Sequence, residues 1–204
     1  MKIFATIHNY GAGAPDSPMG DGDAPLFYEI PDSSISRTGQ PFFVPDFSSE
    51  FRLLPTVVFR ISRLGKGIAP RFAGRYIEGA TMGCAAVATT LLRSLRDNGM
   101  PWTGAVAFDK SCLIGNFMPI DTFLIHREWN VKCGDNEVTY PLDMMRQNID
   151  LLVAALSRDI TIKEGDMILA ALHPYGFIPR IGDKLIIENN IETGRFKILD
   201  INIR

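Results

Sequence analysis

Two side chains in this sequence have the chemistry of a covalent catalyst. A cysteine and a histidine together can make a nucleophile when their surroundings lower the pKa of the thiol. Cys84 and His173 are the candidates, and Asp109, Lys110 and Ser111 are polar residues that a fold could bring to the same cavity. Cys84 lies in the apolar segment GATMGCAAVAT, however, and apolar surroundings raise a thiol pKa. His173 lies in the segment LHPYG, where a hydrogen-bonded turn residue is the simpler interpretation.

The cysteines as a group do not make a recognisable site. The chain has three of them, Cys84, Cys112 and Cys133, which are far apart in the sequence. They have neither the CxxC spacing of a zinc site nor the density of a disulfide framework. We therefore expect three reduced thiols.

Charge and hydropathy exclude several classes of function. The net charge is −2, and no local cluster of Lys and Arg could hold a phosphate backbone. No apolar run reaches the roughly 18 to 20 residues that a membrane helix needs. The first residues, MKIFATIHNYGAG, have neither the basic region nor the cleavage site of a secretory signal. We expect a cytoplasmic protein that binds neither nucleic acid nor membrane.

The elements that would position a site are mostly strands. Short β-type runs separated by Gly, Pro and Asp turns predict a β-rich α+β fold, and 204 residues are enough for one domain over 1–204. Strands are predicted over 2–7 and 56–62 because of their alternation and β-branched content. The segment 11–23 has no periodicity and is predicted to be a mobile loop that could act as a lid. Two Gly-Asp turns, in IKEGDMILAAL and IGDKLIIE, predict hairpins or meanders.

Two segments have helical periodicity. Residues 88–98 place leucines on one side and arginines elsewhere, and Gly99 and Pro101 follow as stop signals. A longer helix is predicted after Pro141, where apolar residues recur every three or four positions up to Leu156. Its apolar stripe is interpreted as core packing.

Five short segments, read together with Asn9-Tyr10, form a recognisable framework. They are PDSSI, PFFVPDFS, ISRLGKGI, GMPW followed by AFD, and the turn pair EGD and IGD. In order and spacing, this framework resembles the fumarylacetoacetate hydrolase family over nearly the whole chain, from about residue 3 to residue 201. The resemblance implies a mixed β-sandwich or roll around a central pocket, with a few peripheral helices, usually assembled as a homodimer.

The resemblance also implies metal chemistry. Active members hold Mg²⁺ or Mn²⁺ and hydrolyse, decarboxylate or isomerise small keto acids. A hard divalent cation requires oxygen ligands, mainly carboxylates, and then polarises the substrate carbonyl while a base moves a proton. The family pattern supplies two glutamates, an aspartate, two lysines, an Arg-Asp pair, and a His and a Glu after the first Asn-Tyr.

The positions that correspond to these groups carry other residues in this chain. The metal-ligand positions fall on Leu54, Thr56 and Ala85. The lysine positions fall on Ile30 and Val106, the Arg-Asp pair on Thr89 and Thr90, the histidine on Gly13 and the following glutamate on Asp16. His8 precedes the Asn-Tyr pair and does not replace the missing histidine.

The substitutions change the balance of charge together. An opposite pair of unit charges 4 Å apart attracts by about 4 kcal/mol at an effective dielectric constant of 20, so losing three carboxylates removes a gross attraction to a divalent ion of roughly 20 kcal/mol. The cationic positions are lost as well, which avoids buried unpaired charge. We interpret this as a pocket rebuilt with apolar residues, and we expect no cofactor.

Three hypotheses follow. In the first, the chain is a catalytically silent family member, either a structural or regulatory partner or a small-ligand binder. Such a protein would form a homodimer, or a heterodimer with an active paralogue. In the second, it is an enzyme with replaced chemistry at Cys84 and His173. In the third, a divalent-metal-dependent hydrolase, decarboxylase or isomerase survives through the nearest carboxylates, which are Asp46, Glu50 and Glu78.

Overall fold

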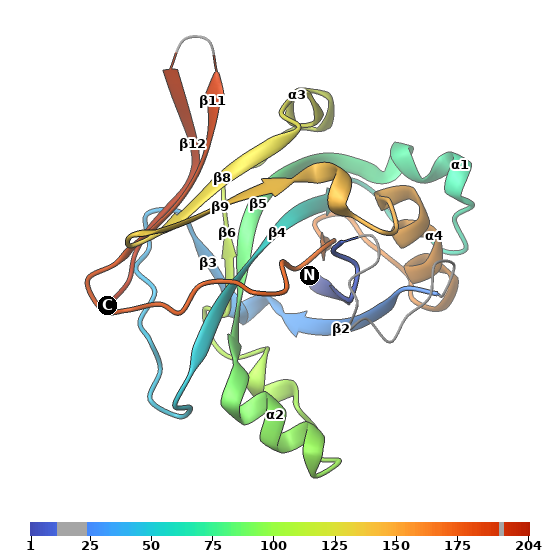
Figure 1. Ribbon diagram of the computed structural model, residues 1–204. Helices are drawn as coiled ribbons and strands as arrows, with labels where there is room; N and C mark the ends of the chain where they lie inside the picture. Colours follow the sequence, from blue (N-terminus) through green and yellow to red (C-terminus); the bar gives the residue numbers. More distant parts are fainter. Residues whose placement is uncertain (12–23, 192–193) are drawn as a thin grey trace.

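The computed structural model describes residues 1–11, 24–191 and 194–204, so the predicted lid at 11–23 lies almost entirely outside the described residues. The described chain folds into two β-sheets with short helices at their margins, as the resemblance implies (Figure 1). In that part of the chain, no helix is both long and apolar enough to cross a membrane.

The larger sheet has eight strands. Seven follow the order β2-β1-β10-β4-β5-β6-β3, and β7 pairs with β5 beside them. Segments that are far apart in the sequence meet here, because β1 lies between β2 and β10 and pairs in parallel with β10. The strands are β1 (Lys2–Ile7), β2 (Leu26–Pro31), β3 (Ile35–Arg37), β4 (Phe51–Ile61), β5 (Ile77–Ala88), β6 (Cys112–Ile114), β7 (Met118–Pro119) and β10 (Met167–Leu169).

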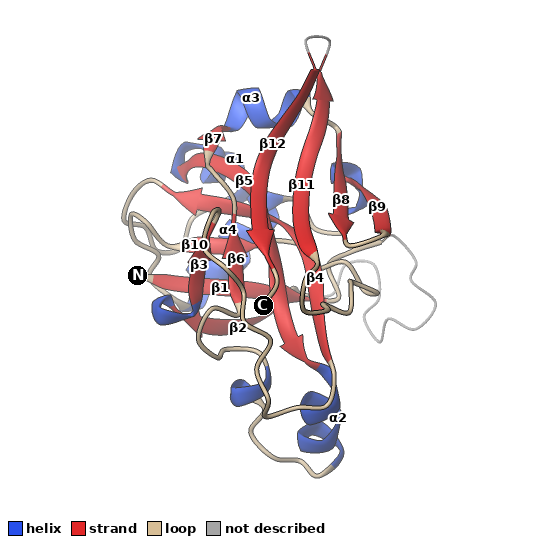
Figure 2. Ribbon diagram, turned by 90° about the vertical axis from the view of Figure 1, so that its left-hand side faces the viewer, coloured by secondary structure: helices blue, strands red, loops and turns tan. Residues whose placement is uncertain are grey.

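The smaller sheet has four strands in the order β12-β11-β8-β9. They are β8 (Glu128–Cys133), β9 (Asn136–Pro141), β11 (Lys184–Ile191) and β12 (Gly194–Asn202). Figure 2 shows β11 and β12 rising toward the end of the molecule opposite to α2 (Thr89–Asp97). The other helices are α1 (Pro70–Ala73), α3 (Ile120–Ile125) and α4 (Ile149–Asp159), with short 3-10 turns at 32–34, 74–76, 103–105 and 142–144.

The larger sheet buries both of its faces. One face packs against the smaller sheet in a cluster that joins Phe4 and Val57 to Trp129 and Leu185. The other face curls around a second apolar cluster built from β1, β2, β4, β5, β6 and β10. This second cluster occupies the inside of the roll. Its nine buried members are Ile3, Ala5, Ile30, Val58, Ala85, Cys112, Ile114, Met167 and Leu169.

Most of the predicted elements are confirmed; one helix begins later than predicted, and one predicted hairpin is absent. The strands at 2–7 and 56–62 and the helix at 88–98 are present as β1, the second half of β4, and α2. The predicted helix after Pro141 begins only at Ile149, because Asn148 caps it by accepting from the backbone N–H of Leu151 at 3.0 Å. The residues before the cap are held by Asn9, whose side chain accepts from the N–H of Gln147 at 2.7 Å and donates to its carbonyl at 3.0 Å.

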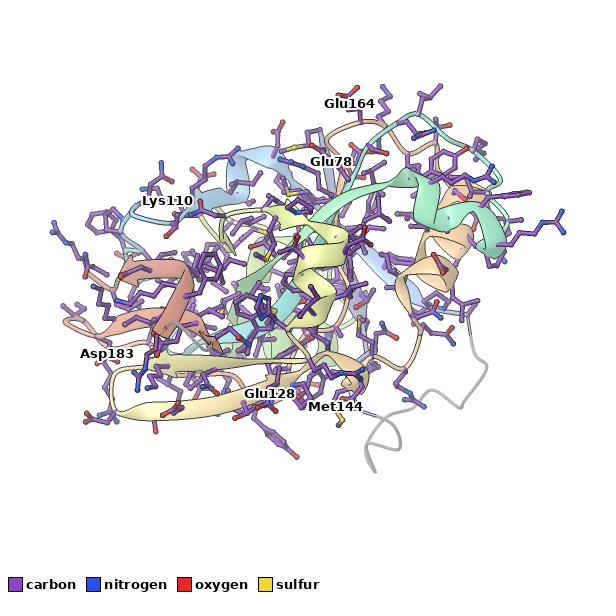
Figure 3. The ribbon with its side chains drawn as sticks, turned by 90° about the horizontal axis from the view of Figure 1, so that it is seen from above. Glu78, Lys110, Glu128, Met144, Glu164 and Asp183 are labelled. Carbon is purple, nitrogen blue, oxygen red and sulfur yellow. The ribbon has the colours of Figure 1, made fainter. Side chains whose placement is uncertain are left out.

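The Gly-Asp turns behave differently from one another. The IGD turn precedes β11, which forms the predicted hairpin with β12. The EGD turn precedes β10, which makes no hairpin and is inserted between β1 and β4. Asp166 holds that insertion in place: it accepts from the N–H of Lys2 at 2.8 Å and lies 2.7 Å from the Lys2 Nζ, while its neighbour Glu164 is exposed (Figure 3).

The two sheets approach closely at Gly115. A Cβ there would lie 2.7 Å from the carbonyl oxygen of Ile198 and 2.8 Å from that of Met82. The neighbouring Asn116 donates its backbone N–H to the same Ile198 carbonyl at 3.0 Å. Glycine is therefore needed where β12 passes close to the middle of β5.

Candidate functional site

The three positions that correspond to metal ligands lie together. In the antiparallel pair β4–β5, Leu54 is directly opposite Ala85 and Thr56 is opposite Gly83. Residues opposite each other, and residues two apart on one strand, share a face of the sheet. Leu54, Thr56 and Ala85 therefore form one small patch on the face that lines the roll.

Apolar side chains surround this patch. Ala85 is 1% exposed and Ile30, at a former lysine position, is 0% exposed; both belong to the apolar cluster inside the roll. Leu54 packs with Val106, the other former lysine position, in a neighbouring apolar cluster. The positions that the resemblance assigns to charged groups thus make hydrocarbon contacts in this chain.

Thr56 is the polar member of the patch, and the backbone uses its hydroxyl. Its Oγ1 donates to the carbonyl of Val57 at 3.1 Å and accepts from the N–H of Ala171 at 3.4 Å. The side chain is fully buried. A hydroxyl already bonded in this way is a poor ligand for a hard cation.

The Thr89-Thr90 pair begins α2 and bonds to the loop before β4. Thr89 Oγ1 donates to the Glu50 carboxylate at 2.8 Å, and Thr90 accepts from the hydroxyl of Ser49 at 3.1 Å. The hydrogen bond from Thr89, followed by that from Arg52, lowers the pKa of Glu50. The two positions that the resemblance assigns to an Arg-Asp pair thus hold the start of α2 in place. Gly13 and Asp16 lie outside the described residues.

A cavity of about 450 Å³ remains beside the patch. Its walls come from the end of β1, from β2, β4, β5 and α2, and from the segment after β10. The lining residues are Thr6, Ile7, His8, Tyr10, Tyr28, Leu54, Val87, Leu92, Arg96, Trp102, Val106, Leu172, His173, Pro174 and Tyr175. A volume of this size is typical of a small-molecule site.

His173 lines the cavity, whereas Cys84 does not. The imidazole Nδ1 of His173 accepts from the N–H of Tyr175 at 3.3 Å, which leaves the other ring nitrogen to carry the proton. Burial lowers the pKa of His173. Cys84 lies in the core between the sheets, makes no hydrogen bond with His173, and has a pKa raised well above its usual value by desolvation.

The remaining polar candidates also lie apart from the cavity. Asp109 is exposed, and the Lys110 ammonium lies 5.4 Å above the Phe43 ring. Ser111 is buried at the end of β5, where its carbonyl accepts from the N–H of Ala86 at 2.6 Å. The structure therefore does not assemble a nucleophile, base and orienting group from the five residues singled out in the sequence.

The nearest carboxylates are likewise engaged or exposed. Glu78 accepts from Arg60 at 2.8 Å on the surface (Figure 3), Glu50 bonds to Thr89 and Arg52, and Asp46 is exposed. Over residues 1–11, 24–191 and 194–204, no group of three or more His, Cys, Asp and Glu side chains could hold a metal ion. The donor set at the patch does not fit Mg²⁺ or Mn²⁺, which require several oxygen ligands.

Sequence reasoning did not identify the aromatic lining of the cavity. Tyr10 and Trp102 entered only as parts of the family framework, and Arg96 was placed only away from the leucine side of its helix. In the structure, the Arg96 guanidinium lies 5.2 Å above the Trp102 ring, and Tyr28 meets the same ring edge-on at 5.3 Å. One feature of the sequence could have indicated this contact: Arg96 and Trp102 are close in the sequence, and the helix ends between them.

Curated relatives cover most of the chain. The mouse (Mus musculus) mitochondrial oxaloacetate tautomerase FAHD1 is 24% identical over 180 residues, which is 85% of this chain and 80% of that protein. Oxaloacetate tautomerase YcgM of Escherichia coli strain K12 is 23% identical over 197 residues, or 91% of this chain and 87% of that one.

Solved structures share the fold. A fumarylpyruvate hydrolase from Pseudomonas aeruginosa, in complex with Mn²⁺ and pyruvate, superposes with a TM-score of 0.83 at 19% identity, covering 100% of this chain and 89% of that chain. A 5-carboxymethyl-2-hydroxymuconate delta-isomerase from Mycobacterium smegmatis superposes at 0.81 and 22% identity, covering 99% of this chain and 78% of that chain. The fumarylacetoacetate (FAA) hydrolase C-terminal family model matches residues 2–170. The chain therefore belongs to the fumarylacetoacetate hydrolase family.

Proposed function

We propose that this chain is a catalytically silent member of its family that has kept the pocket as a small-molecule binding site. The observation that carries the proposal is the patch formed by Leu54, Thr56 and Ala85. It stands where active members place the metal ligands, and it offers two apolar side chains and one hydroxyl bonded to backbone.

The loss of attraction for a divalent ion supports the absence of metal-dependent catalysis. Three carboxylates contribute a gross attraction of roughly 20 kcal/mol to a divalent ion, and backbone carbonyls engaged in β-sheet pairing do not replace it. Without the ion, nothing at the patch polarises a keto-acid carbonyl. His173 lines the cavity as a neutral ring. A single base, without an electrophile that polarises the substrate carbonyl, does not catalyse the reaction of the relatives.

The test is an assay of oxaloacetate tautomerisation. The full chain is mixed with enol oxaloacetate and Mg²⁺ or Mn²⁺, and the loss of enol absorbance is followed, with the E. coli tautomerase as the positive control. We expect a rate equal to that of metal and buffer alone. Calorimetric titration of Mn²⁺ in the presence of oxalate should show no binding heat.

A metal-dependent rate above background would overturn the proposal. It would mean that carboxylates beyond the described residues, such as Asp16, complete a metal site. Micromolar binding of Mn²⁺ by calorimetry would lead to the same conclusion.

The proposal extends to location and assembly. We place the protein in the cytoplasm as a homodimer, with pairing to an active paralogue as the alternative assembly. Several curated relatives are named as mitochondrial proteins, so cell fractionation is the check on location. Light scattering of the purified chain, and co-purification with a tagged active paralogue, separate the two assemblies.

A further inference from the structure

The described residues that line the cavity beside the patch include a cationic side chain but no carboxylate. Arg96 is the residue with a permanent charge among its lining, and no aspartate or glutamate is among the described residues that line it. The histidines of the lining, His8 and His173, both have a pKa lowered chiefly by burial, so they are neutral at pH 7. A cavity of this kind favours a ligand with negative charge.

Arg96 is available to such a ligand. It lies on α2, none of whose residues is buried, and its guanidinium is stacked over Trp102. Its side chain makes no hydrogen bond and no ion pair within the part of the chain that the structure describes. The contact with the Trp102 ring uses none of the guanidinium N–H donors, which can pair with the two oxygens of a carboxylate.

The field of Arg96 reaches into the cavity. It is the second cause, after burial, of the lowered pKa of His8, and it also opposes the rise in the pKa of Tyr28. His8 directly follows β1, and Tyr28 lies in β2; both line the cavity. The positive charge of Arg96 thus acts on the part of the cavity near His8 and Tyr28, where an anionic group would neutralise it, whereas Tyr10 is under the influence of Asp143.

Aromatic side chains shape the rest of the cavity. Tyr28 and Trp102 meet edge-on at 5.3 Å, and the rings of Tyr10 and His173 lie 4.8 Å apart. Flat walls of this kind bind a flat ring by offset or edge contacts. Leu54 and Val106 close the side that a metal would occupy in active relatives, so this side is apolar.

We infer that the cavity binds a small aromatic monocarboxylate without a metal ion, with the ring among Tyr28, Trp102 and Tyr10 and the carboxylate on Arg96. The inference rests on the proposed function, because it takes the pocket as a binding site that has lost its metal. A dicarboxylate fits less well, since its second charge would lie against Leu54 and Val106 without a partner.

The test is calorimetric titration of the full chain with 3-phenylpropanoate in EDTA at about 0.15 M salt, the physiological ionic strength. Comparison with the neutral 3-phenylpropanamide measures how much the negative charge contributes to affinity. Comparison with propanoate measures how much the aromatic ring contributes. The variant Arg96→Gln removes the anchor. Arg93→Gln is the matched control, because Arg93 is exposed on the same helix and does not line the cavity.

We expect 3-phenylpropanoate to bind the wild type at least tenfold more tightly than the amide or propanoate. Arg96→Gln should weaken the carboxylate about tenfold, equivalent to about 1.4 kcal/mol, while Arg93→Gln leaves its affinity unchanged. Equal affinities for carboxylate and amide, no binding at millimolar ligand, or an unchanged affinity in a folded Arg96→Gln variant would each overturn the inference. If that variant does not fold, the comparison of ligands on the wild type decides.

The outcome can be separated from that of the proposed function. Metal-dependent turnover of oxaloacetate would overturn the proposal that the chain is catalytically silent, whatever the titrations in EDTA show. Failure of 3-phenylpropanoate to bind, in a protein without turnover, would overturn only the ligand class inferred here.

Discussion

At the scale of single residues, Ala85 lies at the position that the resemblance assigns to a metal-binding aspartate, in apolar surroundings. An aspartate at this position would enter a cluster that includes Ile3, Ile30 and Val58 and would find no cation there. We expect Ala85→Asp to lower the free energy of unfolding by about 3 kcal/mol or more in urea denaturation. Ala85→Ser is the control of similar size, with a smaller loss.

Adding Mn²⁺ to the Ala85→Asp variant shows whether the patch lacks only this carboxylate or lacks the other oxygen ligands as well. If the other oxygen ligands were still in place, Mn²⁺ would bind the new aspartate and raise the stability of Ala85→Asp by mass action. We expect no such rise. Restoration by Mn²⁺ would show that one substitution is enough to recreate the metal site.

His173 gives the fold a dependence on pH. Burial lowers its pKa in the folded protein, whereas an unfolded histidine titrates near 6.5. The unfolded state therefore takes up protons first, so stability is complete above about pH 6.5 and falls as the pH drops through the folded pKa. We expect the melting temperature to fall less between pH 7.5 and 5 in His173→Asn, whose side-chain oxygen can still accept from Tyr175. Parallel pH profiles of wild type and variant would contradict this.

The residue scale also shows what the sequence could and could not predict of the site. The positions of Leu54, Thr56 and Ala85 followed from the family framework, and their common face follows from strand pairing. Arg96 was missed because a helical pattern shows which side is polar but not which cavity that side borders. Such contacts between distant elements depend on tertiary packing.

At the scale of elements, the close contact between the sheets depends on Gly115. A methyl group there would meet two backbone carbonyls, which cannot rotate away as a side chain can. We expect Gly115→Ala to destabilise the protein by about 1 to 3 kcal/mol in urea denaturation. Gly104→Ala is the control, since a Cβ at Gly104 meets nothing within 4 Å; it should be neutral or slightly stabilising. Equal stabilities of the two variants would contradict the close approach.

The errors in element prediction have a common cause. Apolar spacing after Pro141 suits a helix, but long-range bonds from Asn9 hold residues 145–148 in an irregular path until Asn148 caps α4. Likewise, the apolar run of β10 looks like half of a hairpin, whereas its partners are the distant strands β1 and β4. Local patterns predicted the elements whose partners are local and failed where partners are far away in the sequence.

At the scale of the whole molecule, one core joins both sheets. The cluster between them includes residues from Phe4 to Ile203, so neither sheet can be exposed alone without losing shared contacts. We expect a single unfolding transition in calorimetry, with equal van't Hoff and calorimetric enthalpies. Fluorescence of the buried Trp129 should change together with far-ultraviolet circular dichroism. Two separate transitions would indicate two independently stable units.

The pairing of β1 with β10 has a consequence for synthesis on the ribosome. Lys2–Ile7 must wait for Met167–Leu169 before its parallel partner exists, and at about 5 to 20 residues per second this wait is roughly 8 to 30 s. During that time, an apolar strand with an unpaired edge is exposed to other chains. We expect arrested nascent chains to stay sensitive to protease until β10 has left the exit tunnel. Protection at shorter lengths would show that β1 and β2 are stable before the roll can close.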